Sequence, residues 1–418
     1  MKIKALSIAV GAGLLSTAAM ANPFEFHGYM RSGIGATASG GDQMCFQADG
    51  SPYKHRLGNE CETYAEAAFV ANAYEEGDKS MSVHALFAYS VAGNNDWEDD
   101  APATREMFVK GDNMVDGLNG ATIWAGKRYY QRRDVHQIDY YYLANAGAGG
   151  GIENIDLGFG KLSAAWVRNT EEAYLDTNNP IEPRDREVED FAGNNLDLRL
   201  DGIQTNTNGE LSLVAIYGKY SENDGTDLDT DNTKDSGVFL MAEHAQGFMG
   251  GFNKLSFTYA NDAMAGIGAF GQLRGIKAED SNDSNKANYY RVLNFGMVEL
   301  GANTNVSYVL NYENYDRKDD AGQSLFTIGV RPQYNWNTNL STIVDLGYDI
   351  VDFDDAAEKE DNKLFKATVA QQWQAGPGAF ARPAIRAFAT YARADQNISR
   401  DADSKDEVTF GLQAEAWW

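Results

Sequence analysis

The sequence has no apolar run of bilayer-spanning length after its first 21 residues, few prolines and almost no cysteine. A transmembrane helix needs about 20 consecutive apolar residues, so a helical membrane protein is excluded. The 2 cysteines are too few and too far apart for a zinc or redox centre without further ligands. Basic residues are also in deficit, with 35 Lys and Arg against 61 Asp and Glu. Because phosphate binding needs a basic surface, nucleic acid is not an expected partner.

The N-terminal residues have the three parts of a signal peptide for export. Lys2 and Lys4 precede an apolar run over Ala5–Leu15, and the small-residue site A-M-A follows. The run is shorter than a bilayer-spanning helix, so we expect residues 1–21 to be removed as a leader. No linker or shift in composition divides the rest, which predicts a single domain over residues 22–418.

The C-terminal segment alternates apolar and polar side chains, as a strand with a lipid-facing side and a polar side does. Val408, Phe410 and Leu412 share one face, whereas Thr409 and Gln413 share the other. The same period of two recurs along the chain. Further apolar sets that alternate with polar residues are Leu196, Leu198 and Leu200; Leu255, Phe257 and Tyr259; Val306, Tyr308, Leu310 and Tyr312; and Val344, Leu346, Tyr348 and Ile350.

Pattern and composition together predict an all-β fold, a transmembrane antiparallel up-and-down β-barrel with short periplasmic turns and long outer loops. The 42 glycines, 8 prolines and 12% aromatic residues are typical of such a barrel. The length allows about 16 to 20 strands, and a barrel of that size has an aqueous channel. The polar segments Glu222–Gly237 and Lys277–Lys286 are expected to be outer loops.

Two segments do not alternate. Cys45 and Cys61 form the only cysteine pair of an exported chain, so a disulfide between them is expected. It would stabilise one outer loop by roughly 3 kcal/mol in the chain-entropy model.

The second segment, Thr122–Tyr142, combines three arginines with five tyrosines. So much charge would be costly against lipid, and we expect this segment to fold into the lumen as a constriction. Arginine and carboxylate groups can bond sugar hydroxyls, and tyrosine can stack on a pyranose ring. The alternative is an ordinary charged eyelet that sets only ion selectivity.

These segments and the chain ends resemble the maltoporin family. The motifs occur in the family's order over the whole mature chain: F-H-G-Y-M-R-S-G-I-G from Phe26, R-L-G-N-E-C-E-T-Y-A-E from Arg56, N-D-W-E from Asn95, T-I-W-A-G-K-R from Thr122, Q-R-R-D-V-H-Q-I-D-Y-Y-Y from Gln131, and the final A-E-A-W-W. The resemblance implies a homotrimeric barrel of about 18 strands in a Gram-negative outer membrane. It also implies passive passage of maltose and maltodextrins, without a cofactor.

The resemblance further implies an aromatic path for the sugar, flanked by a polar track and narrowed by Tyr141. Alternation places most path residues on the lumen side, away from the lipid-facing aromatic girdle of barrels; the argument is weaker for Phe380, where Pro383 interrupts the strand, and alternation does not place Trp97. The path comprises Tyr29, Tyr64, Trp97, Phe252, Phe380 and Trp417, with Trp97 expected to reach a neighbouring subunit; the track comprises Arg31, Arg56, Glu66, Arg105, Arg132, Asp134, His136 and Asp139.

The chain departs from the family pattern in three places. Phe380 stands where tryptophan is usual, the last outer loop around Ala394–Asp406 is short, and Arg133 replaces a histidine, which adds a positive charge near the constriction.

Rival functions remain to be weighed. A sucrose-type porin would have an extra N-terminal segment, and a general porin would lack sugar preference. A hydrolase is disfavoured because none of the five histidines has a nucleophile motif. A metal role is disfavoured as well: His136 lacks a second histidine nearby, and Asp227, Asp229 and Asp231 do not complete a calcium loop.

Overall fold

The computed structural model describes residues 24–93, 97–172, 190–221, 234–273, 286–357, 359–396, 398 and 404–418. The expected leader lies outside these residues, and so do the three aspartates of the rejected calcium loop. The two expected outer loops and the loop around 394–406 are only partly described. Gly237, expected to end the first of these loops, lies instead in the following strand.

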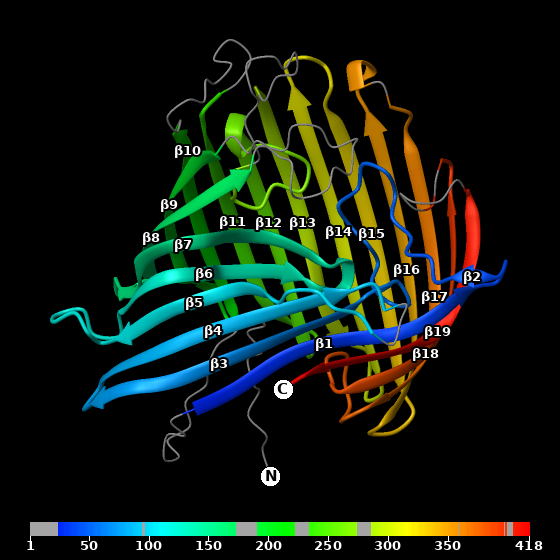
Figure 1. The fold of residues 1–418 in the computed structure, drawn as a ribbon, viewed down its shortest axis with the longest axis horizontal. Coiled ribbons are helices and arrows are strands. Elements are labelled where there is room, and N and C mark those ends of the chain that lie inside the picture. The colour runs from blue at the N-terminus through cyan, green and yellow to red at the C-terminus, as the bar shows by residue number, and fades with distance from the viewer. Residues whose placement is uncertain are drawn as a thin grey trace.

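The described residues form one closed antiparallel sheet of 19 strands, of which β2 has only two residues. The other 18 make the barrel wall, and three short 3-10 helices lie in the connections (Figure 1). The strands are β1 (Phe24–Thr37), β2 (Gly41–Asp42), β3 (Thr63–Glu76), β4 (Lys79–Val91), β5 (Ala103–Asp112), β6 (Thr122–Val135), β7 (Tyr140–Asp156), β8 (Lys161–Glu172), β9 (Asp190–Asn206), β10 (Gly209–Ser221), β11 (Ser236–Phe248), β12 (Gly251–Asn261), β13 (Ala287–Glu299), β14 (Thr304–Arg317), β15 (Gln323–Asn335), β16 (Leu340–Phe353), β17 (Asn362–Gln374), β18 (Ala384–Ala394) and β19 (Asp406–Trp417); the 3-10 helices are η1 (His136–Ile138), η2 (Asp262–Met264) and η3 (Asp355–Ala357).

The alternation expected from the sequence is confirmed. In β19 Phe410 and Leu412 are exposed on the outer face, whereas Thr409 and Gln413 are buried on the inner one. Because a one-residue slip would exchange the two faces, the lipid-facing pattern sets the register of each pair of strands. Among the described residues, no helix is long and apolar enough to cross a membrane.

Most connections at one end of the barrel are short turns, with the longer β5–β6 and β17–β18 connections as exceptions, and most connections at the other end are longer. At β11–β12 the turn is Met249–Gly250, and both residues have positive φ, +46° and +76°. A two-residue hairpin turn of this hand matches the strand twist. The barrel closes where β1 pairs with β19, with Tyr29 opposite Trp417. The backbone N–H of Trp418 also donates to the carbonyl of Gly28, at 3.2 Å.

The disulfide Cys45–Cys61 is present, but its loop is not an outer loop. The loop folds into the barrel, where Phe46, Tyr53 and Leu57 are buried. In Figure 1 it runs between the front strands β1 and β3 and the back strands β14 to β16. The loop folds inward because its apolar side chains can be buried against other apolar groups inside the barrel.

The expected inward constriction is also present, with a later start than expected. Thr122–Lys127 is ordinary wall that pairs with β5, and only the tip of the β6–β7 hairpin leaves the wall. Val135 and Ile138 at this tip are buried in the same core cluster as Phe46. A third segment, η2 with the residues up to Leu273, joins this cluster. The three segments fill one side of the lumen.

Candidate functional site

Three of the expected path aromatics come together on adjacent strands. The rings of Tyr29 and Tyr64 have centroids 6.1 Å apart, and Trp417 lies opposite Tyr29 in the β1–β19 pair. Their position follows from lumen parity on β3, β1 and β19, which are neighbours because the barrel closes there. The hydroxyl of Tyr29 donates to Glu415 at 3.1 Å, which fixes the ring's tilt.

The remaining path aromatics lie in two other places. Phe252 of β12 and Phe380 of the β17–β18 connection are stacked, with centroids 6.5 Å apart and planes at 29°. Phe380, for which alternation gave the weakest argument, thus lies beside another expected path residue. Trp97 is 84% exposed and makes no ring contact with any aromatic that the structure describes.

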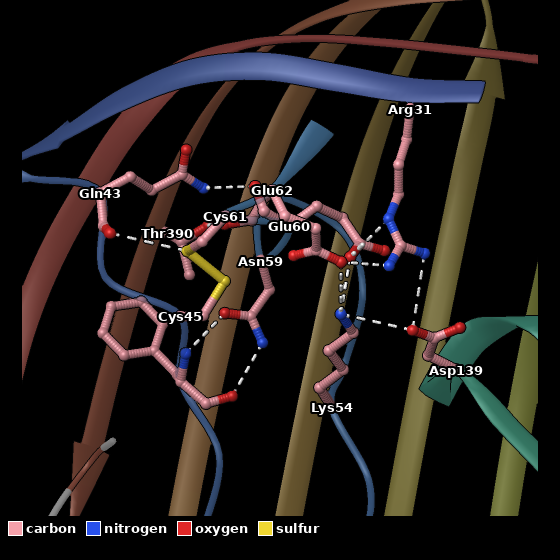
Figure 2. Close-up of a disulfide and its surroundings, with 12 residues drawn as sticks. Arg31, Gln43, Cys45, Lys54, Asn59, Glu60, Cys61, Glu62, Asp139 and Thr390 are labelled. Atoms are coloured by element: carbon pink, nitrogen blue, oxygen red, sulfur yellow. Dashed lines mark hydrogen bonds and ion pairs between the residues drawn. A yellow bond between two sulfur atoms is a disulfide. The ribbon is translucent and has the colours of Figure 1, made fainter. Parts of the chain in front are cut away.

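A network of opposite charges surrounds Glu60, next to the disulfide (Figure 2). The ammonium of Lys54 lies 2.8 Å from a carboxylate oxygen of Glu60 and 3.3 Å from one of Asp139. The guanidinium of Arg31 lies 3.3 Å from Glu60 and 3.6 Å from Asp139, and it also pairs with Glu62. The carboxylate of Asp139 reaches this network because Asp139 ends η1 in a left-handed conformation, at φ +53°.

Arg56 links this network to the aromatic path. Its guanidinium donates to Nδ1 of His136 at 2.8 Å and lies 3.4 Å from Glu415. The ring of His136 meets Trp417 edge to face, with centroids 5.8 Å apart. The guanidinium carbon of Arg382 lies over the Trp417 ring, 4.6 Å from its centroid. Trp417 is therefore in contact with the imidazole of His136 and the charged guanidinium of Arg382.

Burial and the nearby charge of Arg56 lower the pKa of His136 well below its ordinary value, so the imidazole is neutral and its Nδ1 can accept from Arg56. Burial alone would raise the pKa of Asp139, but the charges of Arg56, Lys54 and Arg31 outweigh burial and lower it. Asp139 is therefore a carboxylate at neutral pH, and the site holds fixed charges of both signs.

Three further track residues, Arg132, Asp134 and Glu66, lie near Tyr141, which is 38% exposed. The guanidinium carbon of Arg132 lies 3.9 Å from the ring centroids of both Tyr129 and Tyr141. Glu66 accepts a hydrogen bond from Tyr64 at 2.5 Å. Asp134 is half-buried on the same hairpin, and its charge and that of Glu66 act on Arg132.

The match to one protein family, LamB porin, extends over residues 24–418. The chain belongs to the LamB porin family. This porin is accordingly a β-barrel channel of a Gram-negative outer membrane, and its outward apolar side chains face lipid.

Solved structures with a similar fold include other porins. A BenF-like porin from Pseudomonas fluorescens Pf-5 has 11% identity and a TM-score of 0.52, over 95% of this chain and 99% of that one. OpdQ of Pseudomonas aeruginosa has 11% identity and a TM-score of 0.51, with the same coverage of 95% and 99%. At such identities the likeness concerns the fold alone.

Sequence reasoning missed several charged residues of the porin's constriction. Lys54, Glu60 and Glu62 were not expected there, although the two glutamates flank Cys61 and could have been noticed with it. Arg382 was also missed as a partner of Glu415, 2.7 Å away. It precedes Pro383 in a connection without a regular pattern, so no periodic signal marked it.

Arg133 does not add free positive charge beside the path. Its guanidinium donates to Asp201 of β9 at 2.6 Å and to Glu243 of β11 at 3.0 Å. The side chain therefore ties the β6–β7 hairpin to β9 and β11, and its charge is neutralised there. The two acidic partners are far away in the sequence, which is why the doublet with Arg132 gave no hint of them.

The disulfide loop is held in place by wall residues that bond its backbone. Lys366 donates to the carbonyl of Leu57 at 2.7 Å, and Thr368 donates to the same oxygen at 3.0 Å. Gly58, at φ +63°, adopts a conformation that favours glycine, and a Cβ there would lie 2.4 Å from Thr390. These contacts hold Arg56, the residue before Leu57, at the constriction.

Proposed function

We propose that this porin mediates facilitated diffusion of maltose and maltodextrins along the aromatic path. The observation that carries the proposal is the group formed by Tyr29, Tyr64 and Trp417 on three adjacent strands, bordered by Arg31 and Arg56. Flat aromatic faces suit the apolar face of a pyranose ring, and paired charges suit its hydroxyl edge.

Passage requires weak binding at each position. A glucose unit stacks on one ring, at about 1 kcal/mol beyond area burial, while its hydroxyl groups exchange hydrogen bonds among neighbouring charged side chains. Because each step is shallow, the sugar can leave as readily as it binds. A longer glucan covers more rings at once, so its affinity is higher. No bond is broken and no energy source is needed.

We propose further that the porin is a homotrimer in which Trp97 begins the path of a neighbouring subunit. The support is the family membership and the isolation of Trp97, which is 84% exposed and far more open than the other path aromatics. Residues 1–21 are proposed to be removed on export. Mass determination of the purified protein tests the cleavage, and native mass measurement in detergent tests the trimer.

A conductance titration tests the sugar function. The purified porin is inserted in a planar bilayer, and the ion current is recorded with maltodextrins of increasing length and then with sucrose. Block that strengthens with glucan length and is weak for sucrose supports the proposal. Equal block by sucrose would favour a porin for other sugars, and indifference to every sugar would make this a general porin.

A further inference from the structure

The β6–β7 hairpin leaves the barrel wall at Tyr129. The ladder between β5 and β6 runs from Asp112 opposite Thr122 and ends at Met107 opposite Lys127. Beyond this point β6 pairs only with β7, through register shifts between Tyr130 and Asp134. The wall therefore opens between the outer halves of β5 and β6.

Side chains replace the missing ladder bonds at this opening. The backbone N–H of Tyr129 donates to the carboxylate of Glu106 at 2.8 Å, and the ammonium of Lys127 donates to the carbonyl of Thr104 at 2.7 Å. Arg105 bonds the hydroxyl of Tyr129 and lies 5.2 Å from its ring centroid. Tyr129 is therefore tied to β5 by its backbone, its ring and its hydroxyl.

From Tyr129 a stack of rings and guanidinium groups extends to the constriction. Two rings that both lie 3.9 Å from the guanidinium carbon of Arg132 must cover opposite faces of this planar group. The order of the stack is Arg105, Tyr129, Arg132 and Tyr141. Only the edge of Arg132 is left to bond a solute, and its thickness separates the two tyrosine rings.

We propose that Tyr129 is a positioning residue that determines the selectivity of the channel. Through Arg132 it sets how far the ring of Tyr141 reaches into the constriction, and Arg105 holds it at the opening of the wall. The ring of Tyr141 is more than one-third exposed, so few other groups restrict its position. Its contact with Arg132, which Tyr129 supports on the opposite face, therefore holds the ring in place. The consequence for sugars rests on the proposed function, whereas the consequence for ions does not.

The test compares Tyr129→Leu with Tyr129→Phe in planar bilayers. Leucine removes the ring, so Tyr141 and Arg132 lose their support. The ion conductance without sugar is expected to rise by a factor of roughly two as the constriction widens. The half-blocking concentration of a six-glucose maltodextrin is expected to rise roughly fivefold to tenfold. Phenylalanine keeps the stack and loses only the bond to Arg105, so both quantities stay near those of the parent protein.

Tyr217→Leu, which removes an outward-facing tyrosine of β10, is the matched control and is expected to change neither quantity. If Tyr129→Leu fails to assemble, Arg105→Gln tests the stack from its exposed end. This variant is expected to raise the conductance by a smaller factor. Unchanged conductance and block in Tyr129→Leu, or in Arg105→Gln if the first variant does not assemble, overturn the proposal. A parent channel that no sugar blocks, with conductance still raised by Tyr129→Leu, would refute the sugar function and keep the positioning role.

Discussion

The two sides of the barrel lumen differ in how far their side chains are buried. On the side formed by β1, β3 and β19, the aromatic side chains of Tyr29, Tyr64 and Trp417 remain partly exposed at the constriction, next to the buried and paired charges of Arg31 and Glu415. On the side formed by β14 to β17, the inward segments cover the wall, and Asp345, Asp349 and Lys366 are buried. One side keeps aromatic rings open to the lumen, and the other is a protein interior.

On the covered side, the wall residues hold the inward disulfide loop in place. A buried charge must be paired, and on the covered side Asp345 lies 3.0 Å from Arg331 and 3.6 Å from Lys366. His55 of the disulfide loop fits between Gly329 and Gly347, which are cross-strand partners, and lies 3.4 Å from Asp349. The covered side holds the loop still, and the loop presents Arg56 to the open side.

The largest effect is expected when the covered side loses a charge. Asp345→Asn would leave the buried Lys366 and the half-buried Arg331 with a neutral partner, and should lower the free energy of unfolding by about 3 kcal/mol. Denaturant unfolding of the detergent-solubilised protein measures this. Asp352→Asn on the exposed outer part of β16 is the control. Equal stability of the two variants would contradict the account of the covered side.

A smaller loss is expected when the slot for His55 is filled. A Cβ on Gly347 would lie 2.3 Å from the ring of His55, so Gly347→Ala should displace the disulfide loop and cost about 2 kcal/mol in unfolding free energy. Gly41→Ala, where the nearest atom would be 3.4 Å away, serves as the control. If both substitutions have the same small effect, His55 does not anchor the loop.

On the open side, loss of stacking should change sugar block and not stability. Trp417→Ala or Tyr64→Ala is expected to weaken maltodextrin block about tenfold, because two or more glucose contacts are disturbed, while ion conductance stays nearly the same. Trp373→Ala removes a lipid-facing tryptophan of β17 and is the matched control. Unchanged block in both path variants would remove these residues from the path.

The smallest effect is expected from a larger ring at position 380 of the aromatic path. Phe380→Trp enlarges the stacking surface beside Phe252 and should strengthen block by long glucans about twofold to threefold. Maltose covers fewer rings at once, so its block should change less. Titration with glucans of different lengths measures the ratio, and an equal gain for maltose and long chains would count against a continuous path.

The wall was predictable, because lipid on one side and a polar lumen on the other impose a period of two that Phe410 and Leu412 obey. Lumen parity put Tyr29, Tyr64 and Trp417 on the inner side of adjacent strands, where the structure has them, and their role as a sugar path stays a prediction. The inward loop from Cys45 to Cys61 was predicted as a disulfide loop but assigned to the outer surface. No period marks it, and the bonds that hold it come from Lys366, more than 300 residues away in the sequence.

Charge partners were the least predictable part of the site. Resemblance brought Arg31, Arg56 and Asp139 to the constriction, but Lys54 and Glu60 join them through a fold of the loop that no local pattern shows. Arg132 was expected to bond sugar hydroxyls, and the structure adds that two tyrosine rings cover its faces. Such pairings depend on three-dimensional proximity between distant segments, and alternation carries no information about it.

The most direct test is a crystal structure of the porin soaked with a six-glucose maltodextrin. The account predicts consecutive glucose rings stacked on Tyr64, Tyr29 and Trp417, with their hydroxyl groups beside Arg31 and Arg56 and the covered side empty of sugar. Sugar bound elsewhere in the lumen, or a channel without sugar at a saturating concentration, would contradict it.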